Sequence, residues 1–118
     1  MESNRMALVI EDDEDLAIIF TEALHMSGFK TKTIRDGKQA EEELDTSQPD
    51  LILLDLHLPR VNGLQLLTKI RRDERIKNAK VIVATADARM SEMAEEADFT
   101  LIKPISFAQL RDLCARLR

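Results

Sequence analysis

Short apolar runs alternate with helical patterns five times along the chain. Three runs, at residues 7–10, 51–54 and 80–84, are continuously apolar except for the leading Lys80, which is typical of parallel strands buried on both faces. The runs at residues 30–34 and 99–102 are more polar, as strands at sheet edges often are. We therefore predict five strands, with the second and the fifth at the edges.

Amphipathic helical patterns fill the segments that follow these strands. Asp36-Gly37 opens a charged second helix that ends before Pro49, and Ser106 with Gln109 resembles a capping box that opens the last helix. In the other segments apolar residues recur at helical spacing, which predicts one face packed on a sheet. These residues are Leu16, Ile19, Phe20, Ala23 and Leu24; Leu64, Leu67 and Ile70; Met90, Met93, Ala94 and Ala97; and Phe107, Leu110, Leu113, Cys114 and Leu117.

The alternation of strands and helices predicts an α/β fold. Short connections imply right-handed crossovers and therefore a doubly wound five-stranded parallel sheet with helices on both faces. A length of 118 residues, 44% of them hydrophobic, fits one compact domain over residues 1–118. In such sheets, functional groups gather beyond the carboxyl ends of the strands.

Charge and composition argue against several functions. The formal net charge is −5, whereas direct binding to nucleic acid needs clustered Lys and Arg. No stretch approaches the roughly 20 apolar residues of a membrane span, so we expect no membrane partner. The single Cys114 has no partner for an internal disulfide, which favours the cytoplasm.

Charged and polar residues stand at the ends of four predicted strands. They are Glu11, Asp12, Asp13 and Glu14 after the first, Asp55 at the third, Thr85 at the fourth and Lys103 at the fifth. Crowded carboxylates repel one another unless a cation joins them. Hard oxygen ligands without a His/Cys cluster indicate Mg²⁺. Asp55 would then be a nucleophile, while Lys103, Thr85 and the metal would stabilise charge on a transferred phosphoryl group.

Four motifs make this arrangement specific. They are residues 8–13 (Leu-Val-Ile-Glu-Asp-Asp), residues 51–59 with Gly63, residues 81–86 (Val-Ile-Val-Ala-Thr-Ala) and residues 101–104 (Leu-Ile-Lys-Pro). With all four in order, the chain resembles the response-regulator receiver domains of two-component signalling over essentially its whole length. The resemblance implies a flavodoxin-like, CheY-like sheet with the strand order 2-1-3-4-5.

The resemblance also assigns the phosphorylation chemistry. Asp55 would accept a phosphoryl group, as an acyl phosphate, from a histidine kinase, a phosphotransfer protein or a small phosphodonor. Asp13 would ligate Mg²⁺ directly and Asp12 mainly through water. The backbone carbonyl of His57 would complete the protein ligands, and the domain would not act as a multiple-turnover enzyme.

Lys103 and Thr85 have roles in the switch that the resemblance implies. Lys103 would pair with Asp55 and then with the phosphate, steadied by a cis bond before Pro104. Thr85 would swing toward the phosphoryl oxygens and carry the signal outward, and His57 would border the phosphate. The phosphorylation state would control a downstream effector domain or protein, and a homodimer is a further expectation.

Two features depart from the usual receiver pattern. Relatives generally carry Tyr or Phe three residues before the strand-five lysine, where this chain has Thr100. The segment from Thr85 to Lys103 is shorter than usual by about one helical turn, roughly 3.6 residues. This predicts a shortened fourth helix and a weakened or altered coupling between the phosphate and the surface around it.

Other interpretations of these residues stay open. Asp12 and Asp13 would also suit the N-terminus of the first helix, where carboxylates meet free N–H groups. A phosphohydrolase with an aspartyl phosphate would carry a second Asp two residues beyond the nucleophile, where this chain has His57. A receiver-like module that works without phosphate is the other alternative. Ile18 is either a contact residue for a kinase or the edge of the core stripe.

Overall fold

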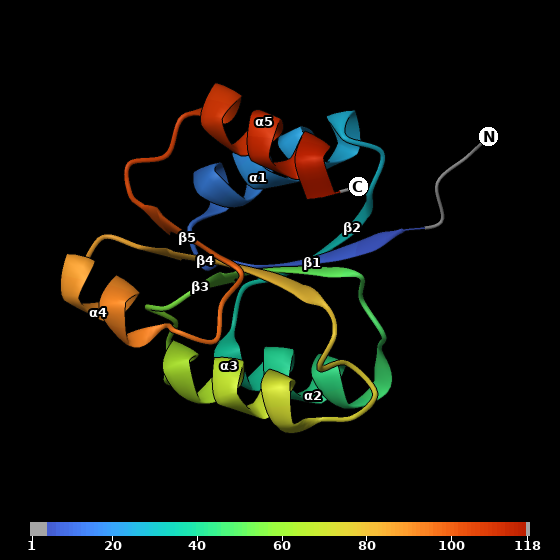
Figure 1. Cartoon of the computed structure of the whole chain (residues 1–118), viewed down its shortest axis with the longest axis vertical. Coiled ribbons are helices and arrows are strands. Elements are labelled where there is room, and N and C mark those ends of the chain that lie inside the picture. Colours follow the sequence, from blue (N-terminus) through green and yellow to red (C-terminus); the bar gives the residue numbers. More distant parts are fainter. Residues whose placement is uncertain (1–4, 118) are drawn as a thin grey trace.

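The computed structural model describes residues 5–117, which form three layers with a sheet between two layers of helices (Figure 1). All neighbouring strands are parallel, and their order is β2-β1-β3-β4-β5. The strands are β1 (Met6–Ile10), β2 (Lys30–Ile34), β3 (Leu51–Asp55), β4 (Lys80–Thr85) and β5 (Phe99–Ile102). The structure confirms the predicted fold, the strand order and the two edge strands.

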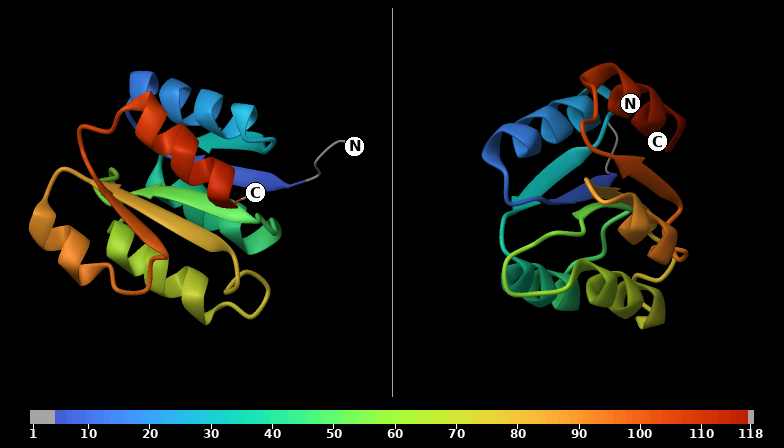
Figure 2. Two further views of the ribbon diagram at one scale, coloured as in Figure 1. Left: turned by 45° about the horizontal axis from the view of Figure 1, so that its top comes forward. Right: turned by 90° about the vertical axis from the view of Figure 1, so that its left-hand side faces the viewer.

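Helices cover both faces of this sheet (Figures 1 and 2). The helices α1 (Glu14–Met26) and α5 (Phe107–Leu117) lie together on one face, and α2 (Gly37–Thr46) and α3 (Gly63–Arg72) lie on the other. The short α4 (Ala88–Met93) contacts β4 and β5 at one edge. None of these described helices is long and apolar enough to cross a bilayer.

The core has two halves because the side chains of a strand alternate between the faces of the sheet. In β1, Ala7 and Val9 join the half under α1 and α5, while Leu8 and Ile10 join the half under α2 and α3. Cys114 is buried in the first half, on α5, as its place in the helical pattern predicts. The same alternation continues beyond the strands and positions the polar residues at their ends.

Side chains cap the helices at their amino ends. In each case an oxygen accepts a hydrogen bond from a backbone amide two or three residues later, an interaction worth about 1 kcal/mol. The capping residues are Asp13, Asp36, Asn62, Asp87 and Ser106. The predicted starts of the second and fifth helices are therefore confirmed.

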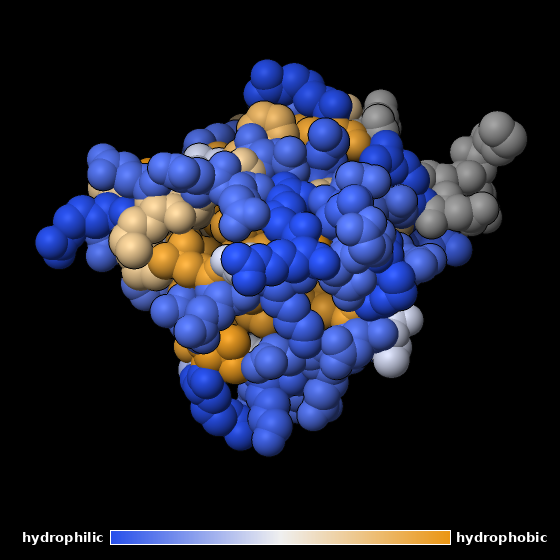
Figure 3. All heavy atoms as spheres, turned by 60° about the horizontal axis from the view of Figure 1, so that its bottom comes forward, coloured by the Kyte–Doolittle hydropathy of each residue, from blue (hydrophilic) through white to orange (hydrophobic). Residues whose placement is uncertain are grey.

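The fourth helix is short, as predicted, but its end differs from the apolar pattern. It has six residues and ends at Met93, so the pattern that continued to Ala97 covers a short helix and a turn. Ala94 is buried at the C-cap, while Met93 is 66% exposed. The expectation that Met93 packs on the core was wrong because the helix ends before its next turn. Figure 3 shows several small groups of apolar atoms on a mostly hydrophilic face, one of them toward the left, the side on which α4 lies in Figure 1.

Candidate functional site

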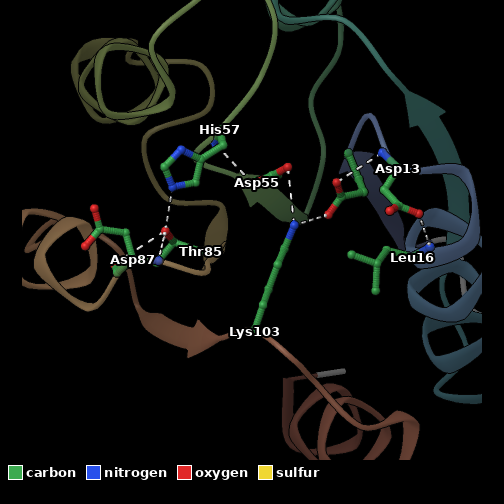
Figure 4. Close-up of polar contacts among 8 residues, drawn as sticks. Asp13, Leu16, Asp55, His57, Thr85, Asp87 and Lys103 are labelled. Atoms are coloured by element: carbon green, nitrogen blue, oxygen red, sulfur yellow. Dashed lines mark hydrogen bonds and ion pairs between the residues drawn. The ribbon is translucent and has the colours of Figure 1, made fainter.

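Asp55 and Lys103 meet at the carboxyl ends of the strands (Figure 4). All five residues of β3 are buried, and Asp55 at its end is only 2% exposed. The Nζ atom of Lys103 lies 3.4 Å from Asp55 Oδ2 and 3.1 Å from Glu11 Oε1. The peptide bond from Lys103 to Pro104 is cis, as the resemblance implied. A buried nucleophile candidate is thus held beside an ammonium group.

The period of the strands explains why these three side chains meet. Side chains two residues apart lie on the same face of a strand. Glu11, Asp55 and Lys103 each lie two residues beyond a core residue of the α1/α5 face, namely Val9, Leu53 and Leu101. Thr85 instead lies two residues beyond Val83, on the α2/α3 face. The site therefore has an acidic side with Lys103 and a separate side with Thr85.

Glu11, Asp12 and Asp55 form an acidic group. Each offers one carboxylate oxygen, and these oxygens all lie within 4.8 Å of one another. Burial raises the pKa of Glu11 to about 7, and the hydrogen bond and charge of Asp55 act in the same direction. Burial would lower the pKa of Lys103, but the nearby carboxylates of Asp55 and Glu11 outweigh it and raise this pKa. Lys103 is therefore an ammonium ion at neutral pH.

Asp13, the expected direct metal ligand, lies outside this acidic group. Its Oδ1 accepts a hydrogen bond of 3.1 Å from the backbone amide of Leu16, so Asp13 is the N-cap of α1. The backbone amide of Glu11 still donates to Ile34 in the manner of the sheet, at 3.0 Å. The structure thus places Glu11 in the acidic group and shows Asp13 in the capping role that its position in the sequence also suited. The alternation of β1 through Val9 is the signal that points to Glu11.

The acidic group suits a small divalent cation. It contains oxygen donors alone, the type that Mg²⁺ prefers. Glu11 Oε1 is completely buried, and its contact with Lys103 is an ion pair without good hydrogen-bond geometry. Asp12 is exposed, which leaves one side of the group open to water and to a ligand. The residues present therefore fit Mg²⁺, which typically retains several waters.

Thr85 and His57 form the other side of the site. Thr85 is fully buried, and its Oγ1 lies 3.0 Å from Nε2 of His57. The same oxygen accepts a hydrogen bond of 3.0 Å from the backbone amide of Asp87. The backbone amide of His57 in turn donates to Asp55 Oδ1 at 3.0 Å. His57 therefore links the hydroxyl of Thr85 to the buried carboxylate.

The loop after β3 positions His57 through a close backbone contact. A Cβ atom at Gly63 would lie 2.6 Å from Cα and 2.8 Å from the carbonyl oxygen of Leu56. Only glycine permits this approach without a backbone shift. Asn62 caps α3 and pairs with His57 in an isolated bridge. The carbonyl of His57, an expected metal ligand, is thus carried by a loop that two specific residues hold in place.

Comparison with known proteins identifies the family. Residues 7–115 match the family model of the response regulator receiver domain. The phosphate regulon transcriptional regulatory protein PhoB of Rhizobium meliloti is 35% identical over 106 residues, which cover 86% of this chain and 47% of PhoB. The probable methanogenesis regulatory protein FilR2 of Methanothrix harundinacea is 33% identical over 116 residues, covering 88% of this chain and 75% of FilR2. The chain spans about half the length of PhoB and of several other curated relatives.

Solved structures agree with the sequence relatives. A CheY-like receiver domain from Methylobacillus flagellatus has a TM-score of 0.84 and 30% identity, with 98% of this chain and 100% of that chain covered. TrrA of Thermotoga maritima, solved in complex with Mg²⁺ and BeF, has a TM-score of 0.84 and 26% identity, with 97% and 99% covered. The chain therefore belongs to the response regulator receiver domains, the phosphoacceptor modules of two-component signalling.

Proposed function

We propose that Asp55 is the phosphoacceptor of this receiver domain. The observation that supports this role is the buried Asp55 carboxylate with the Lys103 ammonium 3.4 Å away. A carboxylate oxygen of Asp55 attacks the phosphorus of the donor, and the bond from phosphorus to the donor atom breaks. The product is an acyl phosphate on Asp55. Lys103 then pairs with the new phosphoryl oxygens, where negative charge develops during the transfer.

Mg²⁺ is the cofactor that we propose for this reaction. Glu11, Asp12 and Asp55 would hold it with their carboxylates, and the backbone carbonyl of His57 would complete the protein ligands. When bound, the ion offsets the charge of the carboxylates and of the phosphoryl oxygens. The relative TrrA, solved with Mg²⁺ and BeF, supports this assignment.

The proposed phosphodonors are a histidine kinase, a phosphotransfer protein or a small phosphodonor. Loss of the phosphoryl group is then a slow hydrolysis of the acyl phosphate on Asp55. Several relatives are transcriptional regulators, so an effector domain or protein that responds to the phosphorylation state is the proposed output. We expect the domain, residues 1–118, to act in the cytoplasm, with a homodimer as one form of its output.

A labelling experiment tests the phosphoacceptor role. The chain is incubated with acetyl phosphate, with Mg²⁺ or with EDTA, and intact mass measures the phosphoryl groups bound. We expect one group per chain in the presence of Mg²⁺, and none in Asp55→Asn or with EDTA. The exposed Glu14→Gln is the control and should label like the parent. Persistent label in Asp55→Asn would move the acceptor elsewhere, while an unlabelled parent would favour a phosphate-independent module.

We also propose that the coupling to the surface near α4 is weakened. Thr100 is an exposed residue of β5, in the place where the usual receiver has an aromatic ring, and α4 has six residues. Hydrogen exchange across residues 89–105 measures this coupling, with and without a phosphoryl mimic and Mg²⁺. We expect the protection of these backbone amides from exchange to change little. Large, localised protection in this segment would contradict the proposal.

A further inference from the structure

The hydroxyl of Thr85 is bonded away from the acidic side of the site. Its side chain follows the α2/α3 face of the sheet, whereas Asp55 and Lys103 follow the opposite face. Figure 4 shows Thr85 joined to His57 and Asp87, on the far side of Asp55 from Lys103. Within residues 5–117, the hydrogen bonds of Thr85 Oγ1 go to these two residues. Thr85 thus starts from a position in which it does not touch the carboxylate.

The backbone of His57 is held at two points, while its exposed side chain contacts Thr85. Its backbone amide donates to Asp55 Oδ1 at 3.0 Å, and its backbone pairs with Asn62 at the start of α3. The imidazole therefore extends from a backbone position that contacts with β3 and with the start of α3 define. The same residue thus contacts both the Asp55 carboxylate, through its backbone, and the Thr85 hydroxyl, through its ring.

The contact between His57 and Thr85 competes with any contact between Thr85 and a phosphoryl group. A hydroxyl has one hydrogen to donate. When the imidazole Nε2 is the acceptor, that hydrogen is already used. When Nε2 is the donor, the bond still keeps Oγ1 on the side of His57. In both cases the 3.0 Å contact has to break before the hydroxyl can reach across to Asp55.

We propose that His57 is a positioning residue that holds Thr85 in its resting place and opposes the switch. This inference rests on the proposed function, because it concerns the response of Thr85 to a phosphoryl group on Asp55. Losing the imidazole removes one hydrogen bond from the resting arrangement alone. The balance then shifts toward the arrangement in which Thr85 contacts the phosphoryl oxygens, and a phosphoryl mimic binds more tightly.

The affinity for a phosphoryl mimic tests this role. Isothermal titration measures the binding of beryllofluoride in the presence of Mg²⁺ to the parent, His57→Ala, His57→Gln, Thr85→Ala and the double variant His57→Ala/Thr85→Ala. One neutral hydrogen bond predicts that His57→Ala binds roughly three- to tenfold more tightly. His57→Gln should stay within about twofold of the parent, because its amide replaces the hydrogen-bonding nitrogen of the ring. In the Thr85→Ala background, the second change should have an effect of less than about twofold.

A spectroscopic measurement without the mimic examines the contact itself. The ¹⁵N shift of His57 Nε2 should move in Thr85→Ala and stay unchanged in Arg89→Ala, an exposed variant on the neighbouring helix. Unchanged or weaker binding of the mimic by His57→Ala would overturn the positioning role, as would an equal effect in the Thr85→Ala background. A parent that does not bind the mimic with Mg²⁺ would instead overturn the proposed function, and with it the inference.

Discussion

Arg71 and Asp98 form an ion pair that joins α3 to the segment before β5, with 2.8 Å between Nη2 and Oδ2. The same carboxylate oxygen accepts a hydrogen bond of 2.8 Å from the backbone amide of Val81. Burial would raise the pKa of Asp98, but the Val81 amide and Arg71 outweigh it and lower this pKa. The guanidinium also donates to backbone carbonyls on both sides of β4, those of Lys77, Ala79 and Glu96. Arg71 thus links α3 to the segments that precede and follow β4.

Replacement of Arg71 should therefore destabilise the domain. Arg71→Ala removes the guanidinium donor from three carbonyls and from Asp98, which keeps only the Val81 amide, and we expect the free energy of unfolding to fall by about 2–3 kcal/mol. Arg71→Lys should recover only part of this loss, because an ammonium group lacks the planar fork of donors. Urea unfolding measures the change. Arg72→Ala, at the exposed neighbouring position, is the matched control and should differ from the parent by less than about 0.5 kcal/mol.

Glu11→Gln should stabilise the metal-free domain. Burial raises the pKa of Glu11 from 4.5 to about 7, a change that corresponds to about 3 kcal/mol against the charged form. The folded state holds this proton more tightly than the unfolded state does, so the stability of the parent falls as the pH rises from 4.5 through 7. At pH 8 in EDTA, we expect Glu11→Gln to be more stable by about 1–3 kcal/mol.

Unfolding measured at several pH values separates the titration of Glu11 from that of other groups. The difference in unfolding free energy between Glu11→Gln and the parent should grow between pH 5 and pH 8, in line with the pKa of about 7. The exposed Glu14→Gln should show no such growth. A constant difference across the series would mean that Glu11 carries no buried charge. Mg²⁺ should stabilise the parent at pH 8 and stabilise Glu11→Gln less.

The neighbours Asp12 and Asp13 should separate metal binding from helix capping. Asp12→Ala removes an oxygen of the acidic group, so we expect the Mg²⁺ affinity to fall at least about tenfold with little loss of stability. Asp13→Ala removes the N-cap of α1 and should cost about 1 kcal/mol, with the Mg²⁺ affinity nearly unchanged. Titration with Mg²⁺ and urea unfolding give the two readouts. The reverse pattern would restore Asp13 as the ligand.

Gly63→Ala should damage both the fold and the site. Alanine has a higher helix propensity than glycine. Its Cβ would nevertheless lie 2.6 Å from Cα of Leu56, so the loop after β3 has to move. We expect a loss of about 2 kcal/mol or more in urea unfolding, together with weaker Mg²⁺ binding as the His57 carbonyl shifts. Gln65→Ala, at an exposed position of α3, is the control. A fully stable Gly63→Ala would show that the loop yields at little cost.

The sequence by itself determined the elements and the edge at which the polar residues gather. Continuous apolar runs predict β1, β3 and β4 to within one residue at each end, because such runs are stable only between two covered faces. Asp55 and Thr85 end parallel strands and Lys103 directly follows one, so they had to reach the same edge. The missing turn in the fourth helix also followed from counting residues between motifs.

Tertiary structure decided which side chains face one another. Three acidic residues follow β1, and the choice among them depends on where the strand ends and the helix begins. Glu11 continues the two-residue alternation of the sheet and contacts Lys103, while Asp13 accepts a hydrogen bond from the backbone of α1 as its N-cap. The same alternation turns Thr85 toward His57 instead of Asp55. A shift of one residue changes the face of a strand, so only the packed sheet fixes these partners.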